Sequence, residues 1–524
     1  MWLRKIFTKN ERHGNITVER PKAMFYHLTA TLWPALVIFL LPVYLFRQFV
    51  RILLALIYRK RYGGLISGAD MVWALETDEW RSVVTVLYML KHTDDRMDLL
   101  EKIKSRAKEK VFDVDDYPKL TSTCHQIMGQ FYLLSNTYAL DECVKELITE
   151  DNEPFSECTL KDYISKICNE PLPMNGTAMW EVLVSNRPLD TNKEGNYLYP
   201  VIFRFNHAVG DGMAFVEFLI KAFHDNSDNH AWDGPSSQRC SEKNHVAKTI
   251  LTRLSGVLHT LYILYSFIGT VLFWRYLRTC DHNSLHGAKL SGNKIAVWSS
   301  EDKPELVSAI RRIRARVQRV TFQDVMHSAI SASFVEYFEK NKEHIPDSIT
   351  VAIPYLLTRR KIRQGPANLT NDFAIGAFTL PTNEKSGLDT LLSTRDHSVF
   401  AKGVPDLEVF IVGSRLLGSI LPVNWLRYWF SCPGITGVIS NVPFTNETSV
   451  IVGHTLHSTV FFIPHRSRTG FSFGVLTTAG KISITLAVDK SLISSKAEAQ
   501  RLIDAIFRNV KRLEMEIVNM DRLD

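Results

Sequence analysis

Two long stretches without a charged side chain constrain the fold of this sequence more than any other feature. The first covers residues 23–46 and the second covers residues 254–274. About 20 apolar residues in a helix suffice to cross the hydrocarbon layer of a membrane. The first stretch starts too late and is too long for the apolar region of a cleavable signal peptide. The sequence therefore predicts membrane contact at both stretches.

The form of that contact stays open at the level of sequence. Pro34 and Pro42 would kink a helix, so a re-entrant hairpin is an alternative to a straight span in the first stretch. The residues that follow combine one apolar helical face with basic side chains, a pattern typical of an interfacial helix, with a buried core helix as the alternative. That face consists of Phe49, Ile52, Leu53, Leu56 and Ile57. The second stretch is expected to span the membrane, dip into it, or pack as a buried helix, and we favour membrane contact.

Charge and cysteine usage narrow the class of protein. The formal net charge is +7, and basic residues cluster before residue 23 and again at residues 47–61, on both sides of the first apolar stretch. Without an aromatic-interleaved basic motif, this placement suits anionic lipid headgroups better than nucleic acid. The 7 cysteines are scattered without a CxxC pair, which argues against a disulfide framework or a zinc site and predicts no bound metal.

Periodicity predicts alternating helices and strands in a chain of 524 residues, long enough for a large two-lobed enzyme. Residues 196–206 are β-rich, and an apolar helical stripe follows from Met213 to Phe223. Residues 225–248 are polar and are interpreted as a linker. Further predictions are a capping box from Thr321 to Asp324 at the start of a helix, a hairpin of residues 471–478 and 482–488, and an amphipathic helix over residues 502–517.

The strongest chemical signal is an HxxxDG motif between the predicted strand and helix. Its first residue, His207, is a suitable general base for acyl transfer to a hydroxyl, because a neutral imidazole is available near pH 7. Asp211 is predicted to pair with an arginine, with Arg359 or Arg360 as candidates, and to hold the turn. Gly212 is predicted to leave room where the substrate or the next helix approaches. A core histidine without a catalytic role is the alternative for His207.

Further segments, in the same order along the chain, resemble the bifunctional wax ester synthase/diacylglycerol acyltransferase family. Gly64 to Asp70, followed by Glu76, is similar to the opening "LSxxD" segment of that family. Trp180-Glu181 is similar to its "PLWE" stretch, and residues 320–325, VTFQDV, to its "TVNDV" helix start. The other similar segments are NSLHGAKLSGNK at residues 283–294, LTNDFAIGAFTLP at residues 369–381, and ISNVP at residues 439–443.

The resemblance implies an α/β (α+β) fold of two lobes, like chloramphenicol acetyltransferase and condensation domains, with a tunnel between them and added hydrophobic membrane segments. It implies His207 as the base and Asn206, Asn371, Asp372, Ser440 and Asn441 as residues that line or brace the tunnel. Asn441 or a nearby backbone N–H would stabilise the oxyanion, although Asn441 before Val-Pro would also serve simply to shape a turn. The expected units are a membrane anchor at 1–62, a first lobe at 63–245, a membrane-contacting segment at 246–280 and a second lobe at 281–524.

The expected activity is transfer of a fatty acyl group from acyl-CoA to a long-chain alcohol, to diacylglycerol, or to both, without a cofactor. Acyl-CoA is a cytosolic donor, so the lobes are expected on the cytosolic face of a membrane, with the endoplasmic reticulum as the predicted location. Two departures from the family pattern keep alternatives open. Asn206 replaces the first histidine of the usual pair, and Phe444-Thr445 replaces Gly-Pro. The alternatives are a catalytically silent lipid-binding or scaffold protein and an acyltransferase with another acceptor.

Overall fold

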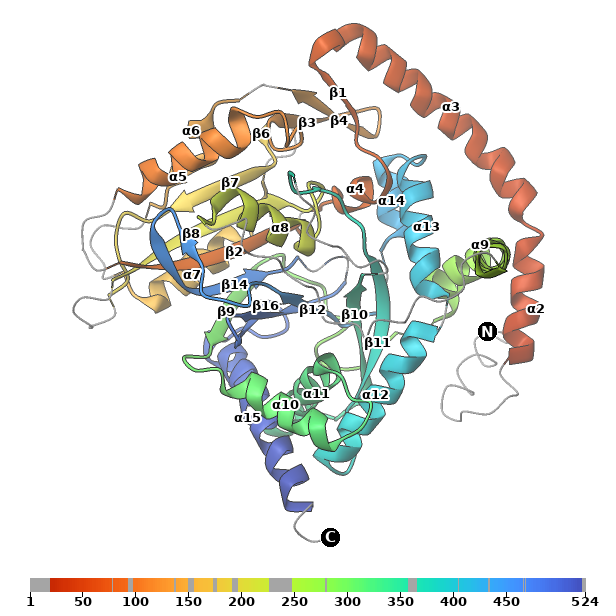
Figure 1. Cartoon of the computed structure of the whole chain (residues 1–524). Coiled ribbons are helices and arrows are strands. Elements are labelled where there is room, and N and C mark those ends of the chain that lie inside the picture. Colours follow the sequence, from red (N-terminus) through yellow and green to blue (C-terminus); the bar gives the residue numbers. More distant parts are fainter. Residues whose placement is uncertain are drawn as a thin grey trace.

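A computed structural model describes residues 19–520 of the chain, apart from several internal gaps. The gaps are 78, 93–97, 136–137, 149–154, 173–176, 191–196, 226–246, 279, 357–364, 404, 432–433, 465 and 467. Most of the predicted polar linker lies outside the described residues, as do Arg359 and Arg360. The described chain forms two lobes, each built on a six-stranded sheet, and a set of long helices at the periphery (Figure 1).

The first lobe carries the sheet that leads to His207. Its strand order is β13-β14-β2-β8-β7-β5, and β2 pairs with β8 in antiparallel register from Val83↔Asn206 to His92↔Tyr197. Both strands are buried over most of their length, as expected for a sheet covered on two faces. The elements are β2 (Val83–His92), α5 (Leu99–Ala107), η3 (Lys108–Phe112), α6 (Leu140–Cys143), β5 (Val144–Glu146), α7 (Glu157–Ile167), β7 (Trp180–Val184), β8 (Tyr197–Asn206) and α8 (Gly212–Phe223).

A smaller sheet lies beside the first lobe and connects it to the N-terminal helices. Its strand order is β1-β4-β3-β6. The strands are β1 (Tyr62–Leu65), β3 (Ser122–Ile127), β4 (Gln130–Ser135) and β6 (Thr177–Ala178), and the short helix α4 (Gly68–Trp73) follows β1. This sheet therefore places α4 close to the point where β8 ends.

The second lobe is built on the order β11-β10-β12-β15-β16-β9. Its helices α11 and α15 pack together over the apolar side chains of this sheet. The elements are β9 (Lys294–Ser300), α10 (Glu305–Arg316), α11 (Phe322–Lys340), β10 (Ser348–Tyr355), β11 (Ala374–Pro381), α12 (Gly387–Gly403), α13 (Asp406–Gly418), α14 (Val423–Trp429), β12 (Gly437–Pro443), β15 (Phe471–Thr478), β16 (Lys481–Asp489) and α15 (Lys496–Met520).

One segment from the C-terminal half of the chain completes the first sheet. β13 (Val450–Ile451) and β14 (His454–Phe462) leave the second lobe, and β14 pairs antiparallel with β2 from Thr455↔Lys91 to Phe462↔Thr85. Apolar side chains from both sheets meet at this crossing, among them Val460, Trp298 and Ala487. The two lobes are therefore interlocked by a shared strand.

Several sequence predictions of local structure are confirmed. β8 and α8 occupy the predicted strand and helix on either side of the HxxxDG motif. Thr321 and Asp324 form the capping box at the start of α11. β15 and β16 form the predicted hairpin around Ala479 and Gly480, which both have positive φ. The amphipathic C-terminal helix is α15.

The outer helices, as we call α2 (Glu19–Ala30), α3 (Trp33–Tyr58) and α9 (Ala247–Leu272), curve around one side of the molecule (Figure 1). The 3₁₀ turn η2 (Arg59–Arg61) follows α3, and the wider turn η5 (Phe273–Leu277) follows α9. Among the described residues, 2 helical segments, Trp33–Arg61 and Gly256–Leu277, are long and apolar enough to cross a membrane. The hairpin alternative is wrong, because α2 and α3 follow one another and Pro42 lies inside α3.

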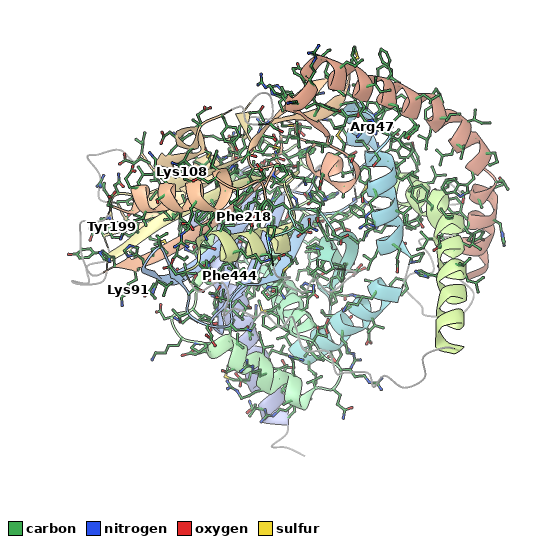
Figure 2. The ribbon with its side chains drawn as sticks, turned by 45° about the horizontal axis from the view of Figure 1, so that its top comes forward. Arg47, Lys91, Lys108, Tyr199, Phe218 and Phe444 are labelled. Carbon is green, nitrogen blue, oxygen red and sulfur yellow. The ribbon has the colours of Figure 1, made fainter. Side chains whose placement is uncertain are left out.

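The continuation of α3 turns its predicted apolar face outward, as an interfacial helix would. Its predicted apolar face is exposed, with Phe49 at 57% and Leu56 at 69% exposure, so the core-helix alternative is wrong. The opposite face is buried, where Val50 and Leu54 pack on the small sheet. Arg47 on this buried face donates hydrogen bonds to Gln130 and to the carbonyl of Ile66 (Figure 2). These contacts attach an apolar, outward-facing helix firmly to the first lobe.

Candidate active site

His207 lies at the first position of a tight turn between β8 and α8. Its backbone N–H donates to the carbonyl of Ser82 at 2.7 Å, which ties the turn to the neighbouring strand. Asp211 ends the turn as the N-cap of α8, with Oδ1 accepting from the backbone N–H of Ala214 at 2.9 Å. N-cap aspartates stabilise a helix start by satisfying a free backbone donor. The motif thus fixes the backbone that presents the imidazole.

The imidazole of His207 is held by Asn371, which the chain supplies from the segment before β11. Nδ1 of His207 and Oδ1 of Asn371 are 2.9 Å apart. The Nδ2 group of Asn371 donates to Asp70 Oδ1 at 2.9 Å and to the carbonyl of His207 at 2.8 Å, and both of these atoms only accept. This network assigns the amide orientation, so Oδ1 faces the ring and Nδ1 carries the proton. Nε2 is then the nitrogen with a free lone pair.

Asp70 and Lys119 form the outer part of the same network. Lys119 Nζ lies 2.6 Å from Asp70 Oδ2 and donates to the carbonyl of Leu369 at 2.8 Å and to that of Val209 at 3.0 Å. One lysine therefore joins the segment before Asn371, the turn after His207, and α4. The network connects both lobes around a single histidine.

Aromatic rings surround the imidazole and remove it from water. Trp73 stacks on His207 with ring centroids 4.4 Å apart and an interplanar angle of 20°, and Phe373 lies 5.8 Å from the imidazole. Only 7% of His207 is exposed. Burial, with the nearby charge of Arg466 as a further contribution, lowers the pKa of His207 to about 4. The ring is therefore neutral at pH 7, as a general base must be.

Arg466 covers the other side of this aromatic wall. Its guanidinium lies 4.7 Å from the ring centre of Trp73 and 4.9 Å from that of Trp80, within the range of cation–π contacts. It also donates to the carbonyl of Val72 at 2.9 Å. Burial lowers the pKa of Arg466 to about 9. This cation sits close enough to His207 to oppose protonation of the imidazole.

Asn206, at the position of the usual first histidine, is fully buried and holds the turn. Its Oδ1 accepts from the backbone N–H of Ala208 at 2.9 Å, and its Nδ2 donates to Glu76 Oε1 at 3.2 Å. Glu76 also accepts from the backbone N–H of Ser82 at 2.9 Å, and burial raises its pKa. An asparagine satisfies both partners here, so the replacement is compatible with an ordered turn.

The remaining residues of the motif region brace the structure. Asp211 Oδ2 accepts from the backbone N–H of Asp372 at 2.9 Å, and the carboxylate of Asp372 pairs with Arg415 of α13 at 2.5 Å. The candidate arginine partners of Asp211 lie outside the described residues. A Cβ added at Gly212 would meet Val442 at 3.5 Å, an ordinary contact, so packing alone does not require glycine there.

Ser440 and Asn441 lie on β12, opposite Gly474 and Val475 of β15. Side chains alternate between the two faces of a strand. Ser440 therefore shares a face with Val442, which approaches Gly212, whereas Asn441 shares a face with Ile439 in the core of the second lobe. Of these two residues, Ser440 is the one on the side of the HxxxDG turn.

The structure brings together His207, Asp211, Asn206, Asn371 and Asp372, which the sequence motif and the family resemblance had singled out, and adds residues that they missed. Asp70 and Glu76 belong to a segment that carried the family resemblance, which was a usable signal. Trp73, three residues after Asp70, follows from helical spacing on α4 only once that helix is placed. No local pattern marks Lys119 or Arg466, because their role depends on contacts across the lobes.

Comparisons with known proteins find similarity to wax ester synthase/diacylglycerol acyltransferases. The family model of the WS/DGAT C-terminal domain matches residues 370–514. Wax ester synthase/diacylglycerol acyltransferase 9 of Arabidopsis thaliana is 21% identical over 416 residues, which cover 71% of this chain and 80% of the relative.

Two solved structures show the same fold at low sequence identity. The wax ester synthase/diacylglycerol acyltransferase of Marinobacter aquaeolei superposes with a TM-score of 0.57 at 14% identity, over 86% of this chain and 98% of the other. Trichothecene 15-O-acetyltransferase of Fusarium sporotrichioides superposes with a TM-score of 0.55 at 10% identity, over 86% of this chain and 94% of the other. The expected two-lobed acyltransferase fold is thereby confirmed. The matched C-terminal domain, the Arabidopsis relative and the common fold lead to one conclusion: the chain is similar to wax ester synthase/diacylglycerol acyltransferases in sequence and shares their two-lobed fold.

Proposed function

We propose that this protein transfers a fatty acyl group from acyl-CoA to a long-chain alcohol, to diacylglycerol, or to both, with Nε2 of His207 as the general base. The observation that carries the proposal is a buried, neutral imidazole whose Nδ1 proton is bound by Asn371 at 2.9 Å. A base fixed in one tautomer is ready to accept a proton without reorganisation. Similarity to the wax ester synthase/diacylglycerol acyltransferases supports this reaction class and these substrates.

In this mechanism the acceptor hydroxyl donates its proton to Nε2 of His207 while its oxygen attacks the thioester carbonyl. The tetrahedral intermediate then collapses, the C–S bond breaks, and the imidazolium returns the proton to the departing thiolate. The products are an ester and free CoA thiol, and no cofactor or metal is needed to balance the step. Burial that disfavours the imidazolium makes the proton return favourable. Oδ1 of Asn371 accepts a hydrogen bond from the Nδ1–H group of His207 throughout.

The developing oxyanion requires donors that are in place before the reaction. Ser440 is a better candidate than Asn441, because its strand face is the one directed at the HxxxDG turn. Asp211, Asn206 and Asp372 hold the turn and the adjoining segment, so we assign them positioning roles. Acyl-CoA and the acceptor would approach His207 from opposite sides of the seam between the lobes.

We also propose that the protein works at the endoplasmic reticulum membrane with both lobes in the cytosol. Long-chain alcohols and diacylglycerol reside in the bilayer, whereas acyl-CoA is a cytosolic donor too polar to cross unaided. The exposed apolar surfaces of α3 and α9 support lipid contact. The free cysteines Cys124, Cys143, Cys158, Cys168 and Cys280 are compatible with a reducing compartment. Protease protection of intact microsomes tests the orientation, and a shielded catalytic lobe would contradict it.

The activity is tested with the full chain in lipid vesicles. Palmitoyl-CoA is supplied with hexadecanol in one set and with diacylglycerol in another, and thiol release and ester product are measured together. We expect equal amounts of thiol and ester with at least one acceptor. Binding of both substrates without ester formation would instead favour the silent lipid-binding protein, and ester formed only with other alcohols would favour a different acceptor. Asn206 alone gives no reason to expect silence, because its contacts are structural.

A further inference from the structure

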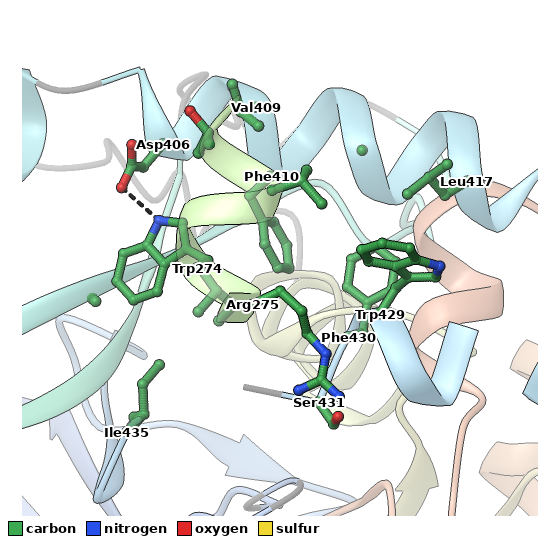
Figure 3. Close-up of a pocket in the computed structure, with 15 residues that line it drawn as sticks. Trp274, Arg275, Asp406, Val409, Phe410, Leu417, Trp429, Phe430, Ser431 and Ile435 are labelled. Atoms are coloured by element: carbon green, nitrogen blue, oxygen red, sulfur yellow. Dashed lines mark hydrogen bonds between the residues drawn. The ribbon is translucent and has the colours of Figure 1, made fainter. Parts of the chain in front are cut away.

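A pocket of about 150 Å³ lies between α9, α13 and β11, apart from the residues that contact His207 (Figure 3). Its walls are mostly apolar, and Val271, Val409, Phe410, Leu417 and Ile435 are among the lining residues. At one side the indole N–H of Trp274 donates to Asp406 at 2.7 Å. An apolar pocket of similar volume in another protein holds a six-carbon ring, so this one accommodates a segment of a single alkyl chain.

One wall of the pocket belongs to an outer helix. Thr270, Val271 and Trp274 line the pocket from α9 and η5, while the preceding turns of α9 expose Val257 at 57% and Leu261 at 56%. A bilayer that covers these exposed side chains would reach the helix that forms the pocket wall. The pocket is therefore next to the lipid phase, on the side of the molecule where the outer helices lie.

Aromatic and cationic groups mark the rim. The hydroxyls of Tyr276 and Tyr428 are 2.9 Å apart, and both side chains are exposed by nearly half. The guanidinium of Arg275, which also lines the pocket, lies 4.1 Å from the ring centre of Tyr428. Tyrosine and arginine gather at the level of lipid headgroups, because one end of each side chain is apolar and the other is hydrated. This rim fits the boundary between headgroups and hydrocarbon.

The β11 wall of the pocket is close in sequence to a ring that contacts the histidine. Ile375 and Ala377 line it from β11, and strand alternation places them on the same face as Phe373. The ring of Phe373 lies 5.0 Å from that of Trp73 and 5.8 Å from that of His207. At about 3.3 Å per residue, Ile375 is only about 7 Å along the strand from Phe373. One wall of the pocket is thus two residues from a ring that lies beside the imidazole.

We infer that this pocket admits one alkyl chain of the acceptor lipid from the bilayer, with its hydroxyl leading toward His207 and its tail remaining between α9 and α13. The inference rests on the proposed acyl transfer and names the acceptor that the pocket suits, a long-chain alcohol with a single tail. The tail of such an alcohol never has to leave an apolar environment. Arg275, Tyr276 and Tyr428 lie where the hydroxyl leaves the headgroup region.

Blocking the pocket tests the inference without touching the histidine. Ala377→Phe should lower kcat/KM for hexadecanol in vesicles at least tenfold, as expected when a chain loses its apolar site. The same variant should change kcat/KM for butanol, which is too short to need the pocket, by less than twofold. Val399→Phe, on a side chain of α12 that is 69% exposed, is the matched control and should change neither value. An equal loss for both alcohols, or no loss for hexadecanol, would overturn the inference.

A labelling experiment separates this inference from the activity itself. A hexadecanol analogue with a photoreactive diazirine on its tail is added to the full chain in vesicles, and the labelled peptides are identified. Labels on α13 or η5 that excess hexadecanol removes would support the pocket even if no ester were formed. Labels confined to other segments would contradict it. Because this readout needs no turnover, failure of the proposed function and failure of the pocket give different results.

Discussion

The turn around His207 and the outer helices differ in which side chains they bury: the turn buries polar side chains, and the outer helices expose apolar ones. Around the turn, Asn206, Asp211 and Asn371 are polar, buried and hydrogen-bonded within the protein. On α3, apolar side chains such as Ile38 at 73% and Leu45 at 57% are exposed with no protein cover. The polar groups of the first region are satisfied within the chain, whereas the second exposes an apolar surface of the kind that marks contact with a membrane or a partner. The proposed chemistry is thus assigned to the first region and the proposed membrane contact to the second.

Substitution of His207 has the largest expected effect and tests whether the buried turn carries the chemistry. His207→Ala should lower kcat about a thousandfold, because a positioned general base contributes on the order of 10²–10⁴. Thiol release and ester formation measure the loss, and circular dichroism verifies the fold. His282→Ala, at an exposed histidine, is the control and should keep full activity. Normal turnover of His207→Ala would remove the mechanism.

A charge introduced on α3 tests whether the outer helices contact the membrane. Ile38→Lys should weaken vesicle binding by about 2.5–3.5 kcal/mol, roughly a hundredfold or more, because a lysine in the middle of a span is costly in hydrocarbon. Flotation with liposomes measures the bound fraction. Ile148→Lys changes an isoleucine that is 80% exposed on the first lobe and should have no effect. Equal binding of the two variants would mean that α3 is not in the membrane.

Substitution of Asn371 tests whether its hydrogen bond to Nδ1 of His207 orients the imidazole. Asn371→Leu should lower kcat roughly tenfold to a hundredfold with little change in KM, since partners of this kind orient a reactive ring without touching the substrate. Steady-state kinetics with varied acceptor separates the two constants. Asn383→Leu, at an exposed asparagine of the same lobe, serves for comparison. A change in KM alone would show that Asn371 binds the substrate instead.

The smallest expected effect is a shift along the pH axis. Protonated His207 has no lone pair to accept a proton, so kcat/KM should stay level from neutral pH down to about pH 5 and fall as the pH passes through about 4. Arg466→Gln removes a charge that lowers the pKa of His207, so the acid limb should move to higher pH. A pH–rate profile of both proteins checks the direction. An unmoved limb would indicate that Arg466 acts only in packing against Trp73 and Trp80.

Local patterns predicted local structure well. The hairpin of β15 and β16, the capping box of α11 and the strand-to-helix turn at His207 each depend on neighbouring residues, so their signals lie within a short window. The site required more. Asn371 was found through resemblance, and its orientation depends on Asp70, 301 positions earlier in the chain. Lys119 joins segments up to 250 positions apart, and no periodicity records such a contact.

The sequence of the outer helices indicates their apolar character but leaves open which face packs against the protein. The stripe at Phe49, Ile52 and Leu56 was correctly identified as amphipathic. Which face meets the protein was decided by Arg47, whose contacts with Gln130 and Ile66 lie across the small sheet. Hydrophobicity alone does not reveal this, because the same stripe suits a core or a lipid surface.

The position of β14 in the first sheet has a consequence for biosynthesis. During translation, β2 emerges early and can pair with β8, but its other neighbour, β14, is completed only when the ribosome reaches Phe462. Until then one edge of an apolar strand stays open, and open edges invite pairing with other chains. A nascent chain of this kind needs a holding factor or an already seated membrane helix to remain monomeric, and expression of residues 63–245 alone should yield aggregates.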